Sequence, residues 1–298
     1  MKIKSDTVKG IMFVNIATFA WTTNMILGRY IRESIGPLTL TAARNIIAAV
    51  IFASVLRKLP KEERNFGKDF PLLAAMALTG VILFAPVLYT GLRFTTAVNS
   101  TLINGLGPIL TAIFASLLIR EPLTGRQLAG SIFAFTGVAV LISGASLEFF
   151  RNAVFNPGDL LIILAVTIWS LYSVAGRKTM KKRSPLSATA LSIFLGLPFL
   201  IAAAAFELQS IPVIPGMKLA VIVIYIGIVP AALGFFSWNV GVGLLGAGGA
   251  MVYYNTIPLY GALLGFLFLG EKIGIPHIIG GILIIGGGLV AAFKKRTK

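Results

Sequence analysis

Ten long apolar segments follow one another along the chain, separated by short hydrophilic gaps. They lie at roughly 8–28, 38–57, 70–91, 95–119, 126–143, 158–176, 186–205, 217–239, 244–269 and 275–293. A helix needs about 20 mostly apolar residues to cross a bilayer, and these segments are close to that length. The pattern therefore predicts an all-α integral membrane protein with ten transmembrane helices.

The two halves of the chain repeat one another. Trp21, Arg29 and Pro37 recur 148 positions later, and further matches are separated by 150 positions. The latter pair Gly91, Pro108, Glu121, Gly130 and Gly137 with Gly241, Pro258, Glu271, Gly280 and Gly287. Because each half has an odd number of spans, the second half enters the bilayer from the opposite side, which is the inverted-repeat plan of secondary transporters. We expect one repeat at 1–143, a connecting loop at 144–157 and an inverted second repeat at 158–298.

Composition agrees with a membrane domain. Hydrophobic residues make up 57% of the chain, charged residues only 12%, and the mean hydropathy is +0.91, outside the soluble globular range. The first span carries the repeated motif and lacks a small-residue cleavage site, so we expect it to be retained. The absence of cysteine excludes disulfides and thiolate metal sites.

The net charge of +16 is concentrated in the gaps between spans. No aromatic residues interleave with these basic runs as they do on nucleic-acid platforms, so we expect no nucleic-acid partner. The distribution favours both termini on the cytoplasmic face of the cell membrane, with binding of lipid headgroups as the alternative role. The runs are Arg57, Lys58, Lys61, Arg64 and Lys68; Arg177, Lys178, Lys181, Lys182 and Arg183; and Lys294, Lys295, Arg296 and Lys298.

The fourth and ninth spans are interrupted at matching positions. The first interruption contains Asn104, Gly105, Gly107 and Pro108, and the second ends at Pro258. Proline removes a backbone donor and bends or breaks a helix. Paired breaks at membrane depth are typical of a transporter's central site, although a membrane proline can also bend a helix without lining a cavity.

Spans one and six present matching polar and aromatic residues. Trp21 and Asn24 correspond to Trp169 and Tyr172, and both tryptophans lie near mid-membrane, away from the interfacial belt. We interpret them as walls of a substrate pocket, with simple packing as the alternative. Tyr253 and Tyr254 are expected to add to this surface.

Arg44 is a charge placed inside a span, about two turns into the second. It either extends toward the near interface or provides a counter-charge for a substrate carboxylate or phosphate. Position 192, its counterpart, is serine, so any such role belongs to one repeat.

Several other residues are expected to be structural. Glu121 and Glu271 follow the fourth and ninth spans and are interpreted as helix-end residues, whereas His277 is interpreted as an incidental interfacial histidine. The glycine stripe through Gly280 and Gly287 is expected to pack the last span within the chain rather than build a dimer.

No acidic residue lies in the middle of a span, and no phosphate-binding loop, zinc motif or nucleophile elbow occurs. We therefore expect neither an enzyme nor an ATP-driven pump, and no cofactor or metal.

The motifs resemble the drug/metabolite transporter superfamily, in particular its ten-span EamA-type members. The resemblance rests first on the run of Trp21, Arg29, Pro37 and Arg44 and on the Gly105-x-Gly107-Pro108 break. It also rests on Glu121-Pro122 with Gly130 and Gly137, and on the second copy through Pro258, Glu271 and Gly280. It covers essentially the whole chain. It implies two inverted five-helix repeats around a central cavity and export of amino acids or related metabolites. The family's second-span arginine falls on Arg44, and Ser192 departs from it in the second repeat.

These observations predict a secondary transporter that exports small metabolites, in the first place neutral or aromatic amino acids, by facilitative alternating access. Its partners are then a small-molecule substrate and the lipid bilayer, and it acts as a monomer or homodimer. The alternatives are a multidrug exporter of hydrophobic compounds and a lipid-carrier flippase.

Overall fold

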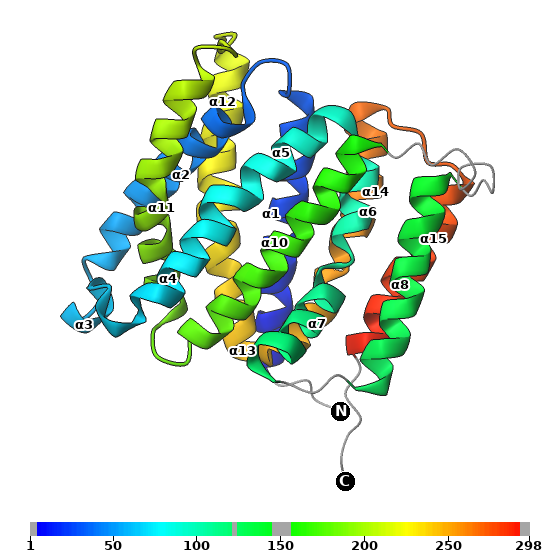
Figure 1. Cartoon of the computed structure of the whole chain (residues 1–298), viewed down its shortest axis with the longest axis horizontal. Coiled ribbons are helices and arrows are strands. Elements are labelled where there is room, and N and C mark those ends of the chain that lie inside the picture. Colours follow the sequence, from blue (N-terminus) through cyan, green and yellow to red (C-terminus); the bar gives the residue numbers. More distant parts are fainter. Residues whose placement is uncertain (1–4, 121–123, 145–155, 293–298) are drawn as a thin grey trace.

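The computed structural model describes residues 5–120, 124–144 and 156–292, and in these ranges it contains helices and no strand. The helices lie side by side, with their connections at the two ends of the bundle (Figure 1). In chain order they are α1 (Ser5–Tyr30), α2 (Pro37–Leu56), α3 (Lys61–Arg64), the 3₁₀ helix η1 (Gly67–Asp69), α4 (Phe70–Met76), the π-helix η2 (Ala77–Leu83), α5 (Phe84–Phe94), α6 (Ala97–Asn104), α7 (Gly107–Ile119), α8 (Gly125–Ser143), α10 (Pro157–Thr179), α11 (Pro185–Glu207), α12 (Met217–Ile226), the π-helix η3 (Gly227–Gly234), α13 (Phe235–Tyr254), α14 (Thr256–Leu269) and α15 (Ile275–Ala292).

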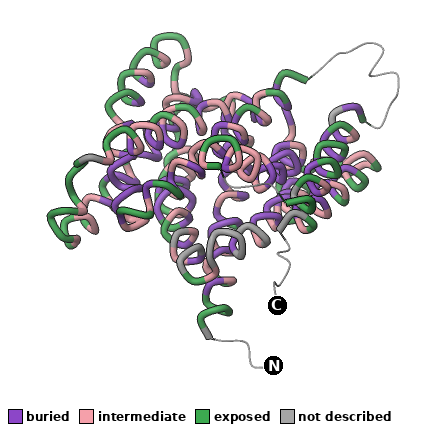
Figure 2. Tube along the Cα trace, turned by 60° about the horizontal axis from the view of Figure 1, so that its bottom comes forward, coloured by how far each residue is buried: buried purple, intermediate pink, exposed green. Residues whose placement is uncertain are grey.

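The lengths and composition of these helices confirm an all-α, multi-pass membrane protein. Among the described residues, seven helical stretches are long and apolar enough to cross a membrane, and three shorter apolar helices lie at Leu128–Leu141, Thr256–Leu269 and Ile275–Val290. Together they account for the ten predicted segments. Figure 2 shows buried residues gathered inside the bundle and exposed ones on its periphery. The exposed side chains include many large apolar ones, such as Phe206 at 77% exposure, as expected where lipid replaces water.

One predicted turn is absent. The sequence pattern places a gap at 240–243 between the eighth and ninth spans, but α13 continues as helix from Phe235 to Tyr254. This segment contains several glycines but no proline, so every residue can donate its backbone amide to the helix. In apolar surroundings the helix keeps those hydrogen bonds, and the break falls later, at Asn255.

Carboxylates of one repeat cap the starts of spans two and seven in the other repeat. The carboxylate of Glu207, at the end of α11, accepts hydrogen bonds from the Leu38 amide at 3.1 Å and the Thr39 amide at 2.7 Å, at the start of α2. Reciprocally, the Glu63 carboxylate accepts from the Ser184 amide at 3.1 Å, at the start of α11. Carboxylates at helix N-termini accept hydrogen bonds from the free amides of the first turn and interact favourably with the positive end of the helix dipole.

A third carboxylate caps the fourth span. Glu271 accepts hydrogen bonds from the Ala97 amide at 2.9 Å and the Val98 amide at 2.8 Å, which confirms its predicted structural role. Glu121, its counterpart in the first repeat, lies outside the described residues.

The last span packs within the chain, as predicted from its glycines. A Cβ atom on Gly280 of α15 would lie 2.8 Å from the carbonyl oxygen of Gly137 in α8. One on Gly287 would lie 2.5 Å from the carbonyl of Gly130. The two backbones therefore approach too closely for any side chain at these positions.

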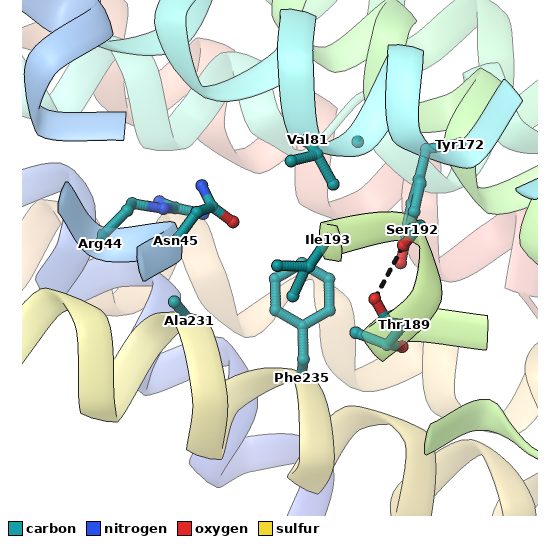
Figure 3. Close-up of a pocket in the computed structure, with 10 residues that line it drawn as sticks. Arg44, Asn45, Val81, Tyr172, Thr189, Ser192, Ile193, Ala231 and Phe235 are labelled. Carbon is teal, nitrogen blue, oxygen red and sulfur yellow. Dashed lines mark hydrogen bonds between the residues drawn. The ribbon is translucent and has the colours of Figure 1, made fainter. Parts of the chain in front are cut away.

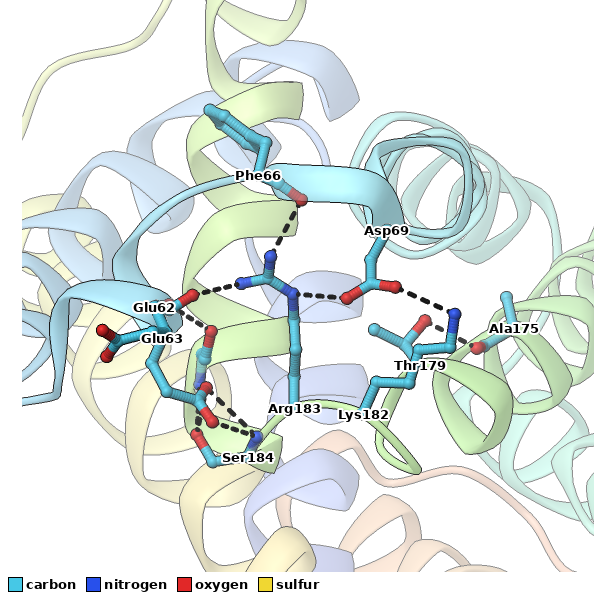
Figure 4. A network of polar contacts seen from close by, with 10 residues as sticks. Glu62, Glu63, Phe66, Asp69, Ala175, Thr179, Lys182, Arg183 and Ser184 are labelled. Carbon is cyan, nitrogen blue, oxygen red and sulfur yellow. Dashed lines mark hydrogen bonds and ion pairs between the residues drawn. The ribbon is translucent and has the colours of Figure 1, made fainter.

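The connections at one end of the bundle are joined by Arg183 (Figure 4). Its guanidinium donates to Asp69 Oδ2 at 3.0 Å and to the Phe66 carbonyl at 2.9 Å, while Lys182 Nζ lies 3.4 Å from Asp69 Oδ1. Burial raises the pKa of the Asp69 carboxyl, but hydrogen bonds from Arg183 and Lys182 outweigh it and leave that pKa below its ordinary value.

We expect Gly280→Leu to destabilise the protein by about 2 kcal/mol or more, because the new side chain meets a backbone carbonyl that cannot rotate away. The melting temperature in detergent measures this. Gly286→Leu is the matched control, since a Cβ at Gly286 meets nothing within 4 Å. An equal melting temperature for both variants would contradict the close packing of α8 and α15.

We expect Asp69→Asn to lower the melting temperature at neutral pH. The pKa of Asp69 is lower in the folded protein than in the unfolded chain, where it is about 3.9. Its charge therefore stabilises the fold above about pH 3.9, and this stabilisation is lost as the pH falls through the folded-state pKa. The difference from wild type should therefore shrink below about pH 4. Glu62→Gln, at a side chain exposed to solvent, is the control. A difference that persisted unchanged in acid would show that the Asp69 charge is not its source.

Candidate functional site

Aromatic side chains from both repeats meet inside the bundle. The ring centroids of Trp21 and Trp169 are 5.5 Å apart, and those of Trp21 and Trp238 are 5.4 Å apart. Tyr172 stacks on Trp169 at 4.8 Å, and Phe235 lies 5.8 Å from Trp21. Corresponding tryptophans of spans one and six therefore face one another, in the tilted and edge-to-face arrangements that aromatic pairs prefer.

Two π-helical segments place these tryptophans, and sequence reasoning missed them. η2 and η3 begin 150 positions apart, at Ala77 and Gly227, so both repeats have the same departure from α-helix. The indole nitrogen of Trp21 donates to the Pro230 carbonyl in η3 at 3.2 Å. Phe84, directly after η2, lies 4.9 Å from Trp169. π-Helical turns often mark functional sites because they redirect side chains and carbonyls.

Arg44 lies in the interior of the bundle and does not extend toward an interface. It is 5% exposed, and Nη1 donates to the Tyr89 hydroxyl at 2.9 Å and to Asn24 Oδ1 at 3.4 Å. The Tyr89 hydroxyl in turn donates to the same Asn24 oxygen at 2.6 Å. Asn24, Arg44 and Tyr89 thus form one hydrogen-bonded group that joins α1, α2 and α5.

Within the described part of the chain, no carboxylate neutralises the charge of Arg44. None of the ion pairs among the described residues involves it, and its buried Nε has no hydrogen-bond partner. A guanidinium held away from water without a counter-ion is costly. The site is therefore suited to an anionic group that arrives with a ligand.

The two helix breaks lie against one another. Tyr254 donates from its hydroxyl to Asn104 Oδ1 at 3.0 Å, whereas the buried Asn104 Nδ2 has no partner. The Tyr254 ring covers Gly107, where a Cβ atom would lie 3.0 Å from the ring. Gly105, Gly107 and Pro108 stand at the junction of α6 and α7, and Pro258 stands in the first turn of α14.

These groups surround a small central cavity. Its volume is about 20 Å³, which is room for a water molecule or two. The aromatic side chains thus fill most of the space between the repeats in this conformation. The cavity is lined by Trp21, Asn24, Met25, Arg44, Phe84, Leu88, Asn104, Trp169, Phe235, Tyr254 and Ile257.

Six of the eight predicted pathway residues line this cavity: Trp21, Asn24, Arg44, Asn104, Trp169 and Tyr254. Tyr172 lies beside it and lines a neighbouring cavity. Tyr253 lines neither of the two. Tyr89, Phe84 and Phe235 were missed. Phe84 and Phe235 each begin the helix that follows a π-helical segment, and neither π-helical segment was predicted from the sequence.

The described residues contain no group of three or more His, Asp or Glu side chains that could hold a metal ion. The polar groups of the site are instead a guanidinium, amides and hydroxyls, which bind and orient a ligand through hydrogen bonds.

Comparisons with known proteins identify relatives along the whole chain. The profile of the EamA-like transporter family matches residues 8–143 and again 156–293. The uncharacterized transporter YyaM of Bacillus subtilis (strain 168) is 29% identical over 288 residues, covering 95% of this chain and 92% of that protein. A probable terminal-alkyne amino-acid exporter of Streptantibioticus cattleyicolor is 23% identical, covering 97% and 94%. One crystal structure shares the fold with a TM-score of 0.63 at 22% identity, covering 97% of each chain.

We expect Tyr89→Phe to lower stability by about 1–3 kcal/mol, because the substitution removes a hydroxyl on which buried Arg44 and Asn24 both depend. Thermal unfolding in detergent provides the measurement. Tyr30→Phe is the control, because the Tyr30 hydroxyl accepts its hydrogen bond from Lys218 at an exposed site, where the loss should be smaller. Equal stability of the two variants would mean that the Tyr89 hydroxyl does not hold Arg44.

Proposed function

The chain belongs to the EamA-like transporter family, and we propose that it exports amino acids with apolar or aromatic side chains through the central cavity. Transport is facilitative and proceeds by alternating access. The protein acts in the cell membrane with both termini in the cytoplasm.

Arg44 is the observation that carries the proposal. Its guanidinium is buried and unneutralised, yet Asn24 and Tyr89 hold it in place from one side. A substrate carboxylate could accept two parallel hydrogen bonds from such a group. The desolvation cost of Arg44 would then be offset only when substrate is bound.

The aromatic wall supports an apolar or aromatic substrate side chain. Trp21 and Trp169 present ring faces and edges against which an apolar group can pack. A lipophilic cation fits less well, since no carboxylate lines the cavity in the described part of the chain. The name of the Streptantibioticus relative agrees with an amino-acid substrate.

The filled cavity supports alternating access. A space of about 20 Å³ cannot hold an amino acid, so the aromatic side chains must move apart when substrate enters. The junctions at Gly105 and Asn255 interrupt the helical hydrogen bonding in corresponding spans and are the proposed hinges.

The basic connections support the proposed orientation. In Figure 1 the short helix α3 lies on the lower side of the bundle, as do the start of α1 and the end of α15. Lysine and arginine are retained preferentially on the cytoplasmic side of membranes.

We expect Arg44→Gln to reduce amino-acid exchange about 10- to 100-fold, the loss associated with a charge-assisted hydrogen bond. The measurement is counterflow of labelled phenylalanine into proteoliposomes that are preloaded with unlabelled phenylalanine. Arg57→Gln is the matched control, because Arg57 follows the end of the same helix and is exposed.

Exchange should not depend on an imposed proton gradient. Wild-type protein that is folded but exchanges no amino acid would refute the proposal. Equal exchange by the Arg44 and Arg57 variants would remove Arg44 from the site.

A further inference from the structure

A second cavity lies on the other side of Arg44. It has a volume of about 10 Å³, and its polar lining comes from Arg44 and Asn45 of α2, Tyr172 of α10, and Thr189 and Ser192 of α11 (Figure 3). Phe235 and Arg44 line both cavities and so stand between them. We call this second space the dyad chamber, because it lies near the two-fold axis that relates the repeats.

The dyad chamber is lined by corresponding residues of the two repeats. Arg44 and Ser192 are 148 positions apart, as are Asn45 and Ile193, and all four line it. The pseudo-two-fold axis that relates the repeats therefore passes through or close to the chamber. The chemistry on its two sides differs, with a charge from the first repeat and a hydroxyl from the second.

The neutral polar side chains that line the chamber mostly present hydrogen-bond acceptors to it. Ser192 Oγ donates to the Thr189 carbonyl at 2.9 Å, and Thr189 Oγ1 donates to the Pro185 carbonyl at 2.8 Å. Tyr172 and Thr189 share a side-chain hydrogen bond. Since a hydroxyl has one hydrogen and two lone pairs, and Ser192 uses its hydrogen on the Thr189 carbonyl, any further hydrogen bond of Ser192 Oγ is one that it accepts.

Asn45 adds an amide oxygen to these acceptors. Its Nδ2 donates to the Thr41 carbonyl at 2.8 Å, and its oxygen points into the chamber (Figure 3). No carboxylate lines the chamber among the described residues. The chamber therefore offers neutral acceptors beside a fixed positive charge.

We propose that the dyad chamber receives the α-ammonium group of the amino acid, with Asn45 and Ser192 as the residues that determine specificity for it. This inference rests on the proposed function. The carboxylate of the substrate binds Arg44, and its side chain occupies the aromatic cavity.

The size and charge of an ammonium group match this space. The group is close in size to a water molecule, which is about what 10 Å³ of cavity accommodates. It carries three donors, and the chamber supplies acceptors. Beside Arg44 the ammonium is repelled, so acceptor oxygens are needed to offset that repulsion. An acid without the amino group would leave them unpaired.

The test uses phenylalanine and 3-phenylpropionate, which differ only in the ammonium group. Each competes against counterflow of labelled phenylalanine in proteoliposomes. We expect wild type to favour phenylalanine about tenfold, as one or two hydrogen bonds would. Asn45→Leu and Ser192→Ala should each abolish most of that preference, because each should weaken competition by phenylalanine and leave competition by 3-phenylpropionate unchanged.

Ser54→Ala is the matched control, because Ser54, like Ser192, donates to the carbonyl three residues earlier in its own helix, here that of Ile51 in α2 at 2.7 Å, but is exposed. Ser192→Ala removes a single oxygen, so it tests whether the chamber binds the ammonium group even if Asn45→Leu does not fold. Equal competition by both compounds in wild type would overturn the chamber's role and leave Arg44 as a carboxylate site. A preference that survived in the folded variants would also overturn it. Absence of any phenylalanine exchange would refute the transport proposal itself.

Discussion

A backbone amide within a bilayer has no water to bond, and this constraint governs where the chain may depart from regular helix. Among the described residues, the π-helical segments η2 and η3 and the junctions at Gly105 and Asn255 all adjoin the aromatic cluster or the cavity. At the helix ends, Glu63, Glu207 and Glu271 supply acceptors from other segments. In the described part of the chain, irregular backbone therefore lies around the central cavity and at the ends of the spans.

Beside the central cavity, the described part of the chain places one charged side chain, that of Arg44. Arg44 is satisfied in part by Asn24 and Tyr89, which orient it without neutralising it. In the proposed mode of binding, the remaining attraction acts on the ligand, and the two cavities that Arg44 lines would place the ligand's side chain among aromatic rings and its ammonium group among acceptor oxygens. Binding strength and selectivity can therefore reside in different helices.

Much of the fold was predictable because apolar length and the repeated motifs are local signals. Trp21, Trp169 and Arg44 could be placed by their depth within spans. The direction in which each side chain points was harder to predict. Tyr253 and Tyr254 are adjacent, and neighbours on a helix point about 100° apart, so of the two only Tyr254 lines the cavity. Tyr89 lies in an apolar stretch, and its role depends on how three helices pack, which periodicity does not reveal.

The duplicated chain also bears on why one polypeptide is needed. Two identical subunits around a two-fold axis must present the same residue from both sides, so arginine at position 44 would face a second arginine. Covalent fusion lifts this requirement, and here serine stands opposite. An amino acid is itself unsymmetrical, with opposite charges on one carbon. Divergence of the copies allows the two sides of the axis to differ, and this difference would match the two unlike ends of the proposed substrate.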